Sequence, residues 1–103
     1  MGNLHLNSGH IQDFEVNLVP EESGRDVAVV IIYTEKESTK FRISTDDRHP
    51  NLKKIMVNLK SGLQMAMDTD KDFMINELPE RTYLFVTYPS GNQEQYTGSR
   101  VKI

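Results

Sequence analysis

One segment of the chain, residues 50–67, has the hydrophobic spacing of an amphipathic helix, and no second segment does. Apolar side chains recur there at intervals of three and four residues, so they share one face of a helix. Pro50 suits the first turn and Asp46 or Asp47 suits the N-cap, so the helix is predicted to begin at Pro50. The apolar face consists of Leu52, Ile55, Met56, Leu59, Leu63 and Ala66. A single helix must cover another layer of structure, and the rest of the chain has to supply that layer.

Gly62 lies inside this helical segment. Glycine at such a position costs about 1 kcal/mol relative to alanine. Two explanations are open: the last turn is weak, or the glycine lets the helix backbone approach a neighbouring sheet closely.

The segments before the helix have the patterns of three β-strands. Residues 11–19 alternate apolar and polar side chains, which predicts a strand near an edge of a sheet with one face in water. Residues 27–33 are apolar on both faces and rich in β-branched side chains, which indicates a central strand. Phe41 and Ile43 alternate with polar residues in a third strand, again with one wet face.

Two further strands are predicted after the helix. Residues 81–88 are covered on both faces, and a turn at residues 89–92 leads into a last strand that ends at Ile103. Residues 73–75 are too few to assign. The predicted fold class is α+β: about five mainly antiparallel strands in the order β-β-β-α-β-β, with the helix packed on one face of the sheet.

The length of 103 residues predicts a single domain with one hydrophobic core. Residues 1–10 have no periodic apolar pattern and are predicted to be loosely ordered, with the domain spanning residues 11–103. Cysteine is absent, which excludes disulfides and thiolate chemistry and favours a reducing compartment, so we expect a cytoplasmic protein. The longest apolar run, residues 27–33, is far shorter than the ~20 residues that span a bilayer, so no membrane partner is expected.

An acidic run after the helix resembles part of a calcium-binding EF-hand loop. Asp68, Asp70 and Asp72 alternate as the first three oxygen ligands of such a loop do. However, Phe73 stands where the loop needs a glycine for its sharp turn, and Pro79 stands where a glutamate should close the site. We therefore predict no metal site, with the three aspartates as a weak calcium candidate.

No arrangement of residues points to catalysis or to a cofactor. The histidines, His5, His10 and His49, lack the spacing of a zinc site on a helix. The run of residues 46–49, Asp-Asp-Arg-His, contains acid–base groups but coincides with the helix start, where capping explains the aspartates. Glycine spacings fit neither a phosphate-binding loop nor a nucleophile elbow. The sequence thus predicts a protein that is not an enzyme, with no cofactor and no small-molecule substrate.

The net charge of −3 is small, but the middle of the chain is basic. Its seven basic residues are Lys36, Lys40, Arg42, Arg48, Lys53, Lys54 and Lys60. A candidate basic surface would use five of them: Arg42, Arg48, Lys53, Lys54 and Lys60. Together with aromatic side chains on the strands, these residues support one hypothesis, the binding of single-stranded or structured nucleic acid.

The hypothesis we prefer is a small non-enzymatic module for protein–protein interaction, such as an adaptor, an inhibitor or an accessory factor. A sheet covered by one helix leaves edge strands whose backbone groups can pair with another chain. The expected contact surface is a sheet edge together with loops. The expected partner is another protein, and a second copy of the chain, giving a homodimer, is one candidate.

Overall fold

Seven strands and one helix make up the part of the chain that the computed structural model describes, residues 3–6, 11–22, 24–69, 71–78 and 82–101. In chain order they are β1 (Asn3–Leu6), β2 (Ile11–Pro20), β3 (Asp26–Thr34), β4 (Ser38–Ser44), α1 (Leu52–Asp68), β5 (Phe73–Leu78), β6 (Tyr83–Thr87) and β7 (Gln93–Val101). The predicted α+β class and single domain are confirmed, with one helix packed on an antiparallel sheet.

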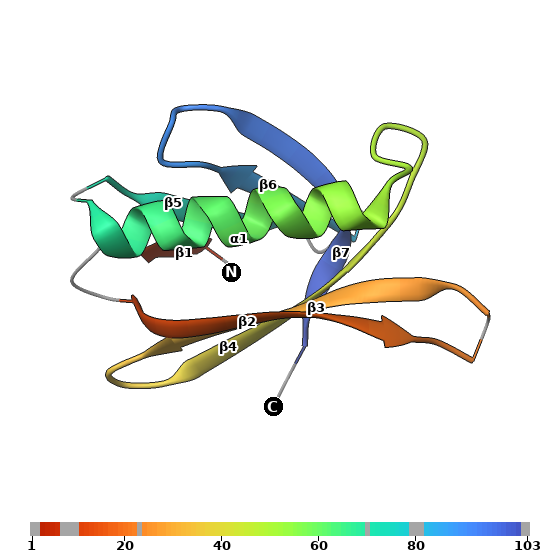
Figure 1. The fold of residues 1–103 in the computed structure, drawn as a ribbon, viewed down its shortest axis with the longest axis horizontal. Helices are drawn as coiled ribbons and strands as arrows, with labels where there is room; N and C mark the ends of the chain where they lie inside the picture. The colour runs from red at the N-terminus through yellow and green to blue at the C-terminus, as the bar shows by residue number, and fades with distance from the viewer. Residues whose placement is uncertain (1–2, 7–10, 23, 70, 79–81, 102–103) are drawn as a thin grey trace.

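The sheet consists of two meanders joined side by side. Its strand order is β1-β5-β6-β7-β4-β3-β2, and every neighbouring pair is antiparallel. One meander is β2-β3-β4 and the other is β5-β6-β7, and the β4–β7 ladder connects them. Helix α1 lies across one face of both meanders and carries the chain from β4 to β5 (Figure 1). Strands β1 and β2 form the two edges of the sheet.

Two strands were missing from the five predicted. Strand β5 begins with three consecutive apolar residues directly after an acidic run, which gives no periodic signal, yet Phe73 and Ile75 alternate toward the core and are fully buried. Strand β1 has four residues, which is too short for a periodic pattern, and it is held by pairing with β5. The other residues of the predicted loose segment, 1–2 and 7–10, lie outside the described residues, so the boundary at residue 10 stays a prediction.

Helix α1 begins later than predicted and with a different cap. Asn51 is the N-cap: its backbone is extended, and its side-chain oxygen accepts from the N–H of Lys54 at 3.2 Å. The expected caps, Asp46 and Asp47, lie in the loop before it. An amide oxygen next to the first turn can reach the free N–H groups, whereas side chains four and five positions earlier cannot. Within the described residues, no helix is long and apolar enough to span a lipid bilayer.

The predicted apolar face of the helix is confirmed. Ile55, Leu59, Leu63 and Ala66 are buried, and they pack in one cluster with side chains from both meanders. Leu52 and Met56 are partly buried at the margin of this cluster. The core therefore lies between α1 and the sheet.

Gly98 allows the two meanders to meet at a sharp twist. It lies on β7 opposite Ile43 of β4, and an added Cβ would lie only 2.3 Å from the carbonyl oxygen of Arg42. In Figure 1, β7 runs from the half of the sheet formed by β5 and β6 to the half formed by β3 and β4. A side chain at position 98 would push these backbones apart.

We therefore expect Gly98→Ala to lower the free energy of unfolding, by about 1–3 kcal/mol or more, because backbone atoms cannot rotate away from the new methyl group. Urea denaturation measures the effect. Ser99→Ala, at the next position of β7, is the matched control and should change stability much less. Equal stability of the two variants would contradict the close approach.

Candidate functional site

The predicted basic residues are divided between the uncovered face of the sheet, the helix and two loops. Along β4, Lys40 and Arg42 alternate with the buried residues Phe41 and Ile43, so they project from the face of the sheet that α1 does not cover. Arg42 pairs there with the carboxylate of Glu21. The other candidates are exposed on the helix or in loops: Lys36, Arg48, Lys53, Lys54 and Lys60. The seven residues therefore do not form one continuous basic surface.

The calcium candidate is only partly described. Asp68 is the last residue of α1, and both of its carboxylate oxygens accept from the side-chain amide of Gln64, at 3.0 and 3.1 Å. Asp70 lies outside the described residues, and Asp72 is exposed just before β5. Within the described residues, no group of three histidine, aspartate or glutamate side chains is placed to hold a metal ion. Because Asp70 lies outside the described residues, the calcium candidate stays a prediction.

Asp46 and His49 hold the loop before the helix against β7. One oxygen of Asp46 accepts from the N–H groups of Arg48 and His49, at 2.8 and 2.9 Å, and the other accepts from the hydroxyl of Thr97 at 2.7 Å. Burial acts to raise the pKa of Asp46, but these hydrogen bonds outweigh it and hold the pKa below its ordinary value. Asp46 thus caps a turn, and the expectation that it caps the helix was wrong.

The His49 ring lies against β7 as well. Its centroid is 4.7 Å from that of Tyr96, and its Nε2 is 3.5 Å from a carboxylate oxygen of Glu94. Sequence reasoning missed both partners because they are about 50 positions away in the chain. Each of these contacts ties the loop to the sheet.

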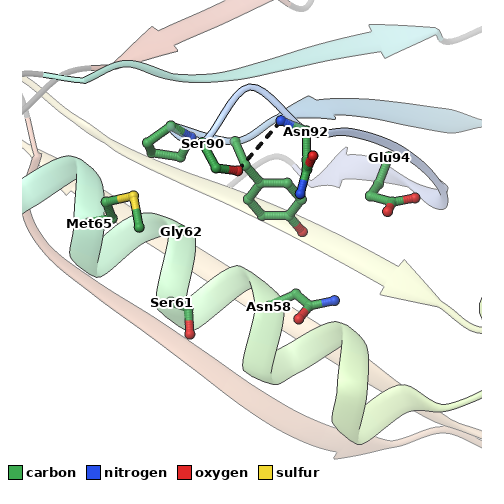
Figure 2. Close-up of a pocket in the computed structure, with 9 residues that line it drawn as sticks. Asn58, Ser61, Gly62, Met65, Ser90, Asn92 and Glu94 are labelled. Carbon is green, nitrogen blue, oxygen red and sulfur yellow. Dashed lines mark hydrogen bonds between the residues drawn. The ribbon is translucent and has the colours of Figure 1, made fainter.

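A small groove lies between α1 and the β6–β7 turn, with a volume of about 200 Å³. Figure 2 shows Asn58, Ser61 and Met65 on the helix opposite Ser90, Asn92 and Glu94 on the turn and β7. Ligand sites usually have at least about 300 Å³. The groove is thus too small for a typical cofactor. Its floor is formed by the close packing of Gly62 and Tyr88.

That packing decides between the two explanations for Gly62. A Cβ on Gly62 would lie 2.5 Å from Cδ1 of Tyr88, so the glycine allows the helix to approach the sheet. The Tyr88 ring is held in place: its hydroxyl lies 2.6 Å from that of Tyr96, and Phe73 contacts it edge-on at 5.8 Å between centroids. The two tyrosines lie on the same face of the β6–β7 hairpin, a relation that becomes visible only once the hairpin register is known.

The outer edge of β2 is the largest unpaired backbone surface of the described sheet. The strand has ten residues, and among the described strands only β3 pairs with it. Across the turn, the N–H of Glu21 donates to the carbonyl of Arg25, so these two residues form a hydrogen-bonded pair. Along an antiparallel ladder, hydrogen-bonded pairs alternate with pairs whose backbone groups point away from each other. By that alternation the backbone groups of Phe14, Val16 and Leu18 point away from β3. In agreement, the N–H of Phe14 is bonded to the side chain of Asp13 at 2.8 Å and not to β3.

Apolar hollows lie between this edge and the helix. One is lined by Phe14 together with Lys60, Gln64 and Met65 of α1, and another by Leu18 with Pro50 and Leu52. Leu18 and Met65 are 43% and 40% exposed, which is high for large apolar side chains in a small domain. The edge therefore combines free backbone groups with an apolar margin.

Comparison with known protein families, with curated proteins and with solved structures gives no match for this chain.

Gly62→Ala is expected to destabilise the protein, although alanine is the better helix former. Propensity favours alanine by about 1 kcal/mol. Overpacking against the fixed Tyr88 ring costs about 1–3 kcal/mol and should outweigh it. Ser61→Ala, one position earlier and exposed, is the control and should be neutral or slightly stabilising in urea denaturation. A more stable Gly62→Ala variant would show that the ring can move aside.

The buried tyrosine pair predicts a loss of stability at alkaline pH. Burial raises the pKa values of Tyr88 and Tyr96 above the ordinary 10.0. Below pH 10 both hydroxyls stay protonated in the folded and unfolded states, so the pair adds no pH dependence. Above it, the unfolded chain releases these protons first, and stability falls as pH rises. Urea midpoints at about pH 8 and pH 11 should therefore differ more in the natural protein than in the double variant Tyr88→Phe, Tyr96→Phe. An equal loss in both proteins would count against this effect.

Proposed function

We propose that the protein is a non-enzymatic interaction module that binds another protein by adding an extended segment of it to the outer edge of β2. The observation that carries this proposal is the ten-residue edge strand whose backbone groups at Val16 and Leu18 point away from the sheet. Edge strands usually carry lysine, internal proline or inward-pointing charge against such pairing. The ladder with β3 has one irregularity, between Ile11 and Asp13, and from Asp13 to Val19 this strand has no lysine and no proline.

The side chains of β2 indicate what kind of segment fits. On the helix side, Phe14 and Leu18 border the apolar hollows, so a partner strand needs apolar side chains at alternate positions. On the other side, β2 presents Asp13, Glu15 and Asn17, so the partner positions that face Asp13 and Glu15 should be neutral or basic. Backbone hydrogen bonds would supply affinity, and these two requirements would supply selectivity.

The remaining polar groups favour binding over catalysis. Asp46 and His49, the acid–base groups of the run at residues 46–49, fix a loop to β7. The cysteine-free composition suits a reducing compartment, so we place this function in the cytoplasm.

The test is affinity capture from host lysate with variants that alter one property of the edge. Leu18→Pro removes an outward N–H that β3 does not use, so the fold should survive, as a circular dichroism spectrum can check. Leu18→Ala is the matched control, because it shortens the side chain but keeps the N–H. We expect a captured protein that resists nuclease, is lost with Leu18→Pro and is at least partly kept with Leu18→Ala.

The nucleic-acid hypothesis predicts a different result. Binding would then be lost on nuclease treatment, would weaken steeply with salt, and would depend on Lys53→Glu with Lys54→Glu but not on Leu18. That outcome would replace the proposed function.

A further inference from the structure

We infer that the segment that β2 accepts is β2 of a second copy of this chain, paired antiparallel about a twofold axis at Val16. This inference rests on the proposed function, and it adds the identity of the partner and the register of pairing. The argument starts from β2 because it is the longer edge: β1, at the other end of the sheet, has four residues.

Only every second residue of β2 directs its backbone groups outward, so only a few positions near the middle of the strand can carry the twofold axis. The outward groups of Phe14, Val16 and Leu18 have to face one another across the axis. An axis at Glu15 would place the two Glu15 carboxylates directly opposite each other, which is unfavourable. An axis at Asn17 would place Phe14 opposite Pro20, which has no N–H to donate. An axis at Val16 keeps the Glu15 carboxylates apart and moves Pro20 to the end of the ladder, opposite Gln12 at the irregularity of the strand, so the pairs made by Phe14, Val16 and Leu18 stay complete.

The Val16 register also matches side chains on the helix side. It sets Phe14 of each copy opposite Leu18 of the other, and Val16 opposite Val16. A twofold axis between antiparallel edges is perpendicular to the sheet, so both helices lie on the same face. Leu18 of one copy, 43% exposed in the single chain, then lies beside the hollow lined by Phe14 and Met65 of the other. The dimer would cover the apolar margin that the single chain exposes.

Charges on the other side of the strand agree with this register. Glu15 comes to lie opposite Asn17, and no acid lies opposite an acid between Asp13 and Val19. Within one chain the Asn17 side-chain amide already donates to Glu15 at 3.5 Å, so the two groups are compatible partners. Each copy carries a net charge of only −3, which opposes association weakly.

The first experiment measures the mass of the purified chain by light scattering over a range of concentrations. We expect a species of 23.6 kDa, twice the 11.8 kDa of one chain, that reverts to the monomer in Leu18→Pro. A dimer that persists in Leu18→Pro, or a monomer at all concentrations, would overturn the inference. In the monomer case, capture of a host protein that depends on the Leu18 N–H would still support the proposed function, so the two failures can be told apart.

The second experiment identifies the register of pairing by disulfide cross-linking. The natural chain has no cysteine, so an introduced cysteine is the sole thiol of each copy. Glu15→Cys and Asn17→Cys each add one exposed thiol to β2. Opposed residues that share no hydrogen bonds have Cα atoms about 4.5 Å apart, which a disulfide can bridge. The Val16 register predicts that a mixture of the two variants cross-links at least about 10-fold faster than either variant alone. Preferential cross-linking of Glu15→Cys alone or of Asn17→Cys alone would place the axis at that residue and contradict the inference.

Discussion

The burial of one helix face against two separate meanders is the interaction on which this structure depends. Leu59, Leu63 and Ala66 are completely buried, and the side chains around them come from both halves of the sheet. Within the described residues, α1 is the one helix that covers them. The sheet must therefore curl around α1, and the sharp approach of β7 to β4 at Gly98 makes this possible.

The same arrangement leaves the sheet open. With the helix in the hollow of the sheet, β1 and β2 end up as separate edges and do not pair with each other. Closure would have removed unpaired backbone groups, as it does in barrels. In the described part of this protein, the unpaired groups are concentrated on one long strand beside exposed apolar side chains, and this connects the fold to the proposed function.

Patterns within one element could be read from the sequence, whereas relations between elements could not. The helical face and the alternation in residues 11–19 are local signals: the structure buries that helical face and forms an edge strand at Ile11–Pro20, although Leu18 on the apolar side of this strand is exposed. Strand β5 gave no such signal, because Phe73 and Ile75 owe their conformation to pairing with β6. The role of Gly62 needed the position of Tyr88, and the outward direction of the Leu18 N–H needed the ladder with β3. For the basic residues, closeness in sequence was misleading. They were expected to form one surface, but alternation along β4 turns Arg42 to the face of the sheet opposite the helix.

The ladder between β4 and β7 bears on how quickly the chain can fold. Each meander pairs neighbours in sequence, so both can form early from local contacts. Their junction instead joins Ser44 to Thr97, residues 53 positions apart. Closing so long a loop costs chain entropy before the contacts of the junction can form and stabilise it. The helix shortens that search, since it is rigid, lies within the loop and brings its ends toward both halves. Docking of the two meanders on α1 is therefore the step at which we place the main kinetic barrier.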